Sequence, residues 1–230
     1  MHVLVIENFP QGPVGLFGEY LTRRHGARLS VVKPEEVPAA PGDEDLLVVL
    51  GSPNGVYEAL PWMAPQRDLI RQTIEAGRPV VGICFGAQIV ASAIGGTVAP
   101  LGRHFAGWIA NAEVADPVWR GPWARAHGDH LTLPPEAEIL ARDQGTIQAF
   151  QYRRAVGVQF HPEADEATLV AWARAQPDYL AENDLTVERL IADTRENVHG
   201  RAAAREALFD EMLRRSMGDA PARPTLSAAV

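Results

Sequence analysis

The only cysteine of this 230-residue chain, Cys84, lies between small residues in the segment formed by residues 79–91. The apolar residues before it predict a short strand, and the apolar pattern after it predicts a helix. Gly82 and Gly86 allow the backbone to bend tightly at this point, as a nucleophile on a strand-to-helix turn requires. The N-terminal end of the helix favours a negative charge on the sulfur, so the segment predicts a reactive thiolate.

A histidine and a carboxylate follow another apolar run in residues 156–163. His161 and Glu163, together with Cys84, supply a nucleophile, a base and a group that orients the base. Each residue alone also fits a structural role: a small buried hydrophobe for Cys84, a core histidine for His161 and a surface carboxylate for Glu163. Packing gives no reason for the glycine-framed cysteine and the His-x-Glu pair to occur together, which favours catalysis.

The elements that must position these residues alternate between strands and helices in the first part of the chain. Strands are expected over residues 2–6, 29–32, 46–50 and 80–83, and helices over residues 14–24, 65–76 and 85–94. This order predicts an α/β fold with a mostly parallel central sheet that is flanked by helices. A more antiparallel section is expected from short strands over residues 97–99, 108–114, 138–141, 147–152 and 155–160.

The end of the chain is expected to be helical. Helices are predicted over residues 165–175, 185–197 and 201–215. We therefore expect a main domain over residues 1–175 and a helical extension over residues 176–217 that packs on the same domain. Residues 218–230 contain prolines and small residues, which indicate a flexible tail.

The composition excludes several classes of protein. The formal net charge is −8 and no basic stripe occurs, so nucleic-acid binding has no electrostatic support. No segment has the roughly 20 consecutive apolar residues that span a membrane, and the N-terminus lacks the pattern of a signal peptide. A lone cysteine suits a reducing compartment, so we expect a cytoplasmic protein.

We expect neither a metal nor a cofactor. His104, His127 and His130 lack compact ligand spacing and are expected in loops and pocket walls. Gly95 and Gly96 follow a helix rather than precede one, so they indicate a helix end and not a phosphate-binding loop.

The chain resembles the class I, or triad, glutamine amidotransferases, and within them the amidotransferase domain of GMP synthase and its free-standing relatives. The resemblance covers about residues 1–175 and is carried by four motifs in the family's order: Gly51-Ser52-Pro53, residues 82–88 (Gly-x-Cys-x-Gly-x-Gln), His127-Gly128-Asp129 and residues 159–163 (Gln-Phe-His-Pro-Glu). It implies a flavodoxin-like fold with a cysteine nucleophile elbow. The chain departs from the family at Ser52, Phe105 and Ala126, which stand for a glycine, a glutamate and a serine.

The resemblance implies a role for each motif. Cys84 would form a thioester, His161 would transfer protons and Glu163 would orient the imidazole, while the backbone amides of Phe85 and Ser52 would form an oxyanion hole. Residues that would hold the substrate are Gly51, Gln88 and Asp129. For Gln88 a plain polar helix residue stays an alternative, and for Asp129 a turn-capping role.

The implied activity is hydrolysis of the γ-glutamyl amide of glutamine. Two uses stay open: an ammonia-supplying chain with a synthase or ligase partner, or a free-standing γ-glutamyl hydrolase that acts on γ-glutamyl amides of amines. A non-catalytic regulatory subunit is disfavoured by the intact triad. Aromatic residues at Tyr57, Trp62, Phe105 and Trp108 either line an amine-side pocket or pack the edge of the sheet.

Overall fold

The computed structural model describes residues 1–218. The tail expected over residues 218–230 lies, apart from Gly218, outside these described residues.

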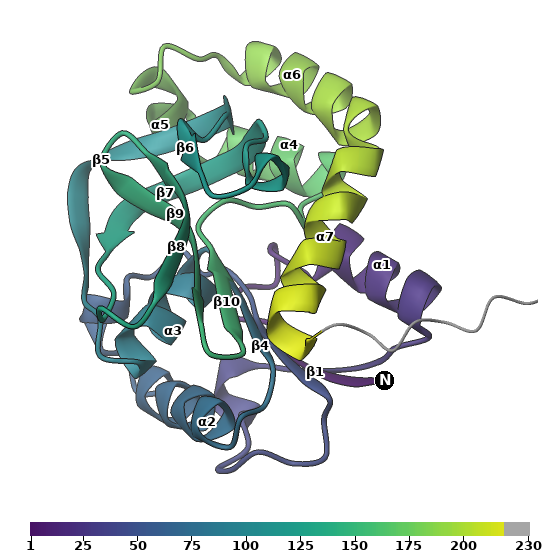
Figure 1. Ribbon diagram of the computed structural model, residues 1–230. Coiled ribbons are helices and arrows are strands. Elements are labelled where there is room, and N and C mark those ends of the chain that lie inside the picture. The colour runs from purple at the N-terminus through teal and green to yellow at the C-terminus, as the bar shows by residue number, and fades with distance from the viewer. Residues whose placement is uncertain (219–230) are drawn as a thin grey trace, which may run out of the picture.

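A central sheet of eight strands runs through the molecule in the order β2-β1-β3-β4-β10-β9-β8-β6 (Figure 1). Its first five strands are parallel: β2 (Arg28–Val32), β1 (His2–Ile6), β3 (Leu46–Val49), β4 (Val80–Ile83) and β10 (Ala155–Val158). The last three are antiparallel: β9 (Thr146–Tyr152), β8 (Glu138–Asp143) and β6 (Glu113–Val114). The expected α/β fold with a mostly parallel sheet is confirmed.

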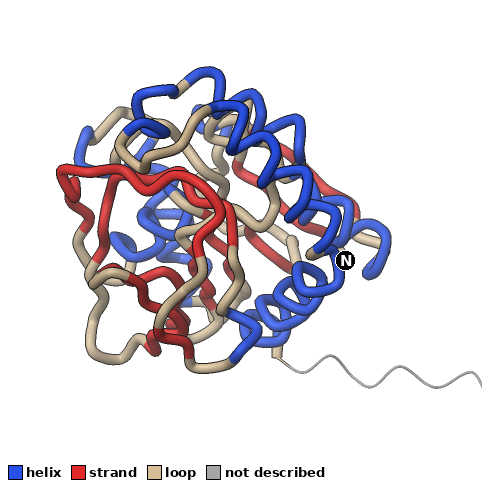
Figure 2. The backbone as a smooth tube through the Cα atoms, turned by 90° about the horizontal axis from the view of Figure 1, so that it is seen from above, coloured by secondary structure: helices blue, strands red, loops and turns tan. Residues whose placement is uncertain are grey.

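Helices cover both faces of the parallel part, as the views of Figures 1 and 2 show. One face packs on α1 (Gly15–His25) and α7 (Ala202–Met217), where the rings of Phe17 and Phe209 lie 4.8 Å apart. The other face packs on α2 (Met63–Glu75) and α3 (Phe85–Ala93). Strands β3 and β4 are buried along their whole length because apolar side chains on both faces are covered.

A separate two-stranded ribbon stands beside the sheet. It consists of β5 (Val98–Ile109) and β7 (Trp123–Leu131), paired antiparallel with a register shift between Pro100 and Phe105. The sequence interpretation was wrong here, because it divided β5 into two short pieces and left β7 without a strand. The register shift lies between Pro100 and Phe105 and includes Gly102, whose φ is 73°.

Three further helices lie against this ribbon: α4 (Glu166–Ala175), α5 (Pro177–Ala181) and α6 (Val187–Gly200). They share with it an apolar cluster built around Ala106, Ala173, Leu180 and Leu190. Short 3₁₀ turns complete the described chain at η1 (Pro34–Glu36), η2 (Val56–Glu58) and η3 (Pro117–Trp119).

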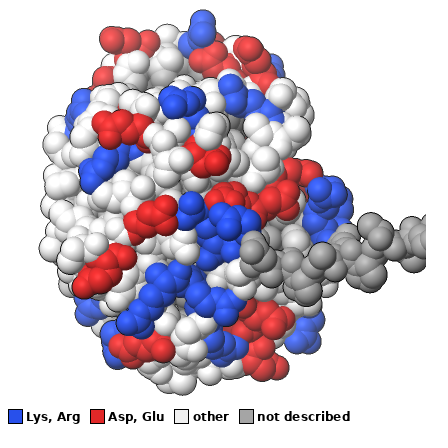
Figure 3. Space-filling model, in the orientation of Figure 1, with Lys and Arg blue, Asp and Glu red and all other residues white. Residues whose placement is uncertain are grey.

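Acidic and basic side chains are interspersed on the face shown in Figure 3. Within residues 1–218, the helices are all too short or too polar to cross a membrane.

Candidate active site

Cys84 occupies the turn between β4 and α3 in a backbone conformation that is rare for a side-chain-bearing residue, with φ 53° and ψ −111°. The two flanking glycines make this turn possible. A Cβ atom at Gly82 would lie 2.5 Å from the backbone oxygen of Gly86, and one at Gly86 would overlap the carbonyl oxygen of Val49. Strain of this kind is typical of functional sites, and here it presents the sulfur above the end of the sheet.

His161 follows β10, the strand beside β4, and the adjacent parallel strands bring it to Cys84. Its Nδ1 and the Oε1 of Glu163 are 2.8 Å apart, and both residues are almost wholly buried. Burial by itself lowers the pKa of His161, but the charges of Glu163 and Cys84 and hydrogen bonds to both outweigh burial and raise it to about 10. The contact with Glu163 therefore favours the protonated form of the imidazole.

Two further groups contact the sulfur. The side-chain amide of Gln159 donates to Sγ at 3.7 Å, and the carbonyl oxygen of Ala126 lies 3.9 Å from Sγ. Gln159 in turn accepts a hydrogen bond of 3.4 Å from Gln88. No role for Gln159 was predicted from the sequence, although it opens the motif that contains His161, and its position two residues before that histidine was the available signal.

The loop after β3 brings Gly51 and Ser52 to the same point. A Cβ at Gly51 would lie 3.3 Å from the His161 ring and 3.8 Å from the Cβ of Cys84, so the loop touches both catalytic candidates. The Ser52 hydroxyl accepts from the backbone N–H of Asn54 at 3.2 Å, which holds the turn. Phe85 is the first residue of α3, so its backbone N–H has no acceptor within the helix.

A polar cavity of about 370 Å³ opens on one side of Cys84. Gln88 and Asp129 both line it, so the structure brings these two substrate-binding candidates together with Cys84. Burial raises the pKa of Asp129, and a hydrogen bond donated by the Tyr57 hydroxyl opposes this shift.

Beside Asp129, burial lowers the pKa of His127 to about 3, so this ring is neutral. Its Nδ1 therefore carries the proton and donates to the backbone oxygen of Asp129 at 3.1 Å. His127 supports the backbone that presents the Asp129 carboxyl group.

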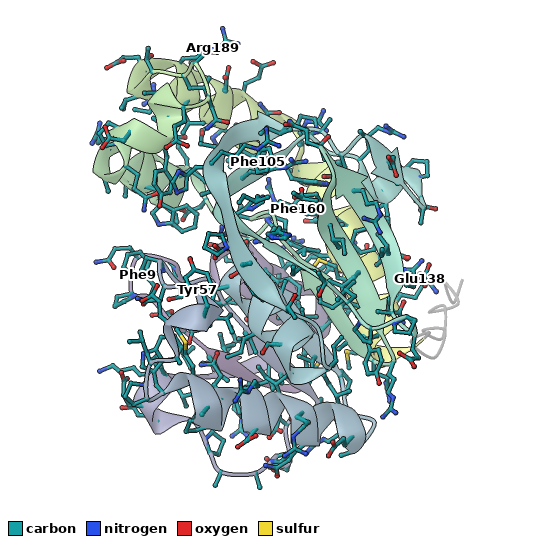
Figure 4. All side chains as sticks on the ribbon, turned by 90° about the vertical axis from the view of Figure 1, so that its left-hand side faces the viewer. Phe9, Tyr57, Phe105, Glu138, Phe160 and Arg189 are labelled. Atoms are coloured by element: carbon teal, nitrogen blue, oxygen red, sulfur yellow. The ribbon has the colours of Figure 1, made fainter. Side chains whose placement is uncertain are left out.

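A smaller cavity of about 60 Å³ opens on the other side of Cys84, next to His161 and Glu163. Gly51, Ser52 and Gln176 also line this cavity, so Gly51 lies here and not in the polar cavity. The other walls are apolar and come from separate parts of the chain: Phe9, Gly12, Pro53, Ala126 and Trp172. The Trp172 ring meets the His161 ring edge-on at 4.7 Å. Figure 4 labels Phe9 and Tyr57, which belong to the loops after β1 and β3.

The aromatic residues proposed for an amine-side pocket are mostly elsewhere. Trp62 packs on the ring of Phe85, and Phe105 is 3% exposed against His127. Trp108 donates its indole N–H to Thr194 in α6 and lines neither of the two cavities that meet at Cys84. Of the four, Tyr57 alone lines the polar cavity, whereas Phe105 packs on His127 and Trp108 bonds to α6.

Among residues 1–218, no group of three histidine, cysteine or acidic side chains is placed to hold a metal ion.

Comparison with known proteins identifies the family. The family described as "Glutamine amidotransferase class-I" matches residues 20–169, which is more than half of the chain. The chain belongs to the class I glutamine amidotransferases. A glutamine-hydrolysing GMP synthase from Thermomicrobium roseum is 40% identical over 131 residues, covering 54% of this chain and 24% of the relative. One from Streptomyces coelicolor is 30% identical over 214 residues, covering 81% of this chain and 39% of the relative.

The chain thus spans about a quarter of the length of the first of these curated relatives and two fifths of the second. Solved structures show the same fold. A glutamine amidotransferase from Thermotoga maritima has a TM-score of 0.78 at 24% identity, over 95% of this chain and 99% of that one. A glutamine amidotransferase from Methylobacillus flagellatus has a TM-score of 0.82 at 22% identity, over 93% and 94%.

Proposed function

We propose that the protein hydrolyses the γ-glutamyl amide bond of glutamine or of a glutamine-like compound through a thioester on Cys84. The observation that carries this proposal is the buried pair of His161 and Glu163 beside a cysteine at which two cavities meet. An intact and solvent-shielded pair of this kind also argues against a purely regulatory role.

In the first step, the Cys84 thiolate attacks the amide carbon and forms a C–S bond. The imidazolium of His161 and the N-terminus of α3 both stabilise the negative sulfur before attack. The backbone N–H groups of Phe85 and Ser52 would stabilise the oxyanion. When the C–N bond breaks, His161 gives its proton to the departing nitrogen and becomes neutral, while Glu163 keeps the ring oriented.

In the second step, water attacks the thioester. Neutral His161 takes a proton from the water, the C–S bond breaks, and glutamate leaves with the new oxygen. Cys84 and His161 return to the thiolate and imidazolium with which the cycle began. Gln88 and Asp129 would hold the amino-acid end of the substrate in the polar cavity, with the Asp129 carboxylate facing the substrate ammonium.

The relatives that match this chain are glutamine-hydrolysing synthases, which supports an ammonia-supplying role with a synthase or ligase partner chain. A second candidate is a γ-glutamyl hydrolase that acts alone on amides of amines, which the apolar cavity beside His161 favours. Both uses share the chemistry of Cys84. The dependence on a free thiol suits a reducing compartment such as the cytoplasm.

The test is release of ammonia or amine from γ-glutamyl amides by the purified chain, compared with Cys84→Ala. We expect turnover and a single covalent adduct with a glutamine analogue that bears an electrophile at the γ-carbon, and neither in the variant. Equal turnover by both proteins would refute the thioester mechanism.

A further inference from the structure

We propose that the cavity on the His161 side of Cys84 is a subsite for the leaving amine, and that the preferred substrate is a γ-glutamyl amide whose nitrogen carries a small apolar group. This inference rests on the proposed function, and it names the substrate class within it.

The position of His161 sets the direction of the substrate. The group that protonates the departing nitrogen must lie next to it, and His161 lines only the smaller of the two cavities that meet at Cys84. The polar groups suited to an amino acid, Gln88 and Asp129, line only the larger cavity. A substrate carbonyl at Cys84 therefore has its glutamyl part in the larger cavity and its nitrogen substituent in the smaller one.

The smaller cavity is larger than ammonia requires. The volume of this cavity is about 60 Å³. By the same measure, a cavity that holds a single water molecule needs only roughly 10–15 Å³. Ammonia is close to water in size, so a primary amide would leave most of this space unfilled. The unfilled volume suits a substituent of a few carbon atoms on the nitrogen.

The walls of the cavity select an uncharged substituent. Phe9, Pro53, Ala126 and Trp172 present apolar surface, Ser52 and Gln176 are polar but uncharged, and the charged residues that line the cavity are His161 and Glu163 themselves. The positive charge of His161 is already paired with Glu163, so a carboxylate on the amine would lie against Glu163 with no unpaired cation to balance it. We therefore expect alkylamides to be accepted and amides of amino acids to be rejected.

Gly12 gives a way to narrow this cavity without distorting the backbone. A Cβ atom there would lie 3.5 Å from Cζ2 of Trp172 and 3.7 Å from Cδ1 of Phe9, which are ordinary contact distances. Gly12→Ala thus places one methyl group between the two aromatic walls. Gly200→Ala is the matched control, because a Cβ at Gly200, at the end of α6, meets nothing within 4 Å.

The experiment measures kcat/KM for glutamine, γ-glutamylmethylamide, γ-glutamylethylamide and γ-glutamylglycine. This constant reports formation of the thioester, whereas its hydrolysis is common to all four substrates. We expect the two alkylamides to exceed glutamine by about tenfold and γ-glutamylglycine to fall below it, since one methylene in an apolar pocket changes selectivity by roughly 10–200-fold. Gly12→Ala should lower the ratio of ethylamide to glutamine by about tenfold, and Gly200→Ala should leave the ratio as it is.

The wild-type panel decides the matter even if Gly12→Ala folds poorly. Glutamine turned over faster than both alkylamides would overturn the amine subsite and favour a cavity that only receives ammonia, while the thioester chemistry would stand. Failure to hydrolyse any of the four, together with no electrophile adduct on Cys84, would overturn the proposed function and this inference with it.

Discussion

Tyr57 reaches across the mouth of the polar cavity and donates a hydrogen bond of 3.1 Å to Oδ1 of Asp129. The two residues come from separate parts of the chain, since Tyr57 lies in η2 after β3 and Asp129 lies in β7. Tyr57 is 50% exposed, so this bond forms at the protein surface. We infer that Tyr57 positions the carboxyl group that would meet the substrate ammonium.

Tyr57→Phe should therefore raise KM more than it lowers kcat. A hydrogen bond of this type contributes about 0.5–1.5 kcal/mol, which corresponds to an increase in KM of roughly 2–12-fold. Because the Tyr57 bond lowers the pKa of Asp129, its loss should also move the acid-side rise in KM to higher pH. Steady-state kinetics between pH 4 and 8 would show both effects, and an unchanged KM profile would remove Tyr57 from substrate binding.

The charge on His161 should depend on both of its acidic neighbours. The ordinary pKa of histidine is near 6.5. With a pKa of about 10, the His161 imidazole should keep its proton above that pH and lose it only under alkaline conditions. Glu163→Gln and Cys84→Ala should each lower this pKa, and the double variant should bring it below 6.5, because only burial then acts. NMR titration of the labelled imidazole nitrogens measures the pKa of His161 in each protein. A wild-type ring that titrates near pH 6.5 would contradict the ion pair between His161 and Glu163.

The same pKa predicts the kinetic profile on the alkaline side. If protonated His161 delivers the proton to the leaving nitrogen, kcat/KM should persist at alkaline pH and decline only as the pH approaches 10. In Glu163→Gln the decline should begin at lower pH and the maximum should fall. A decline at the same pH in both proteins would show that another group controls it.

The glycine framing of the elbow should be indispensable for stability. Gly82→Ala puts a methyl group 2.5 Å from the backbone oxygen of Gly86 and 2.8 Å from the backbone nitrogen of Ala87, so the turn must shift. We expect a loss of about 1–3 kcal/mol in the free energy of unfolding, with loss of activity as the sulfur moves. Chemical denaturation measures it, with Gly200→Ala as the neutral comparison.

Helix α7 should act as part of the main core. Phe209 is 1% exposed and packs on Phe17 and Tyr20 of α1. Phe209→Ala should lower the free energy of unfolding by about 3–5 kcal/mol, whereas Ala203→Ser on the exposed side of α7 should change it by less than about 0.5 kcal/mol. Similar effects of the two changes would mean that α7 contributes little to stability.

The parallel core and the strand-to-helix turn that holds Cys84 could be predicted from the sequence, because their signals are local. Strands β3 and β4 are short apolar runs, and the glycines around Cys84 announce a tight turn. The sequence could place His161 and Glu163 near Cys84, because these residues follow two strands that were expected to be parallel. The ends of parallel strands lie at the same edge of a sheet, and β4 and β10 are neighbours there.

Other parts of the site arise only from tertiary packing. Strand β7 was missed because Ala124, Ala126 and Gly128 give no clear alternation of apolar and polar residues. The walls of the smaller cavity bring together Phe9 and Trp172, from segments that are distant in the sequence. Neither residue belongs to a motif, so no local pattern indicated its place beside His161.

The burial of α7 has a consequence for the synthesis of the protein. Cys84 directly follows β4, and β10 leads to His161. Helix α7 packs against both strands and is translated after them. In a nascent chain, the strands that hold Cys84 and His161 therefore stay uncovered on this face until residues 202–217 have left the ribosome. We expect ribosome-bound chains of increasing length to become protease-resistant and reactive toward a γ-carbon electrophile only at that point, so that hydrolysis begins after translation of the fold is finished.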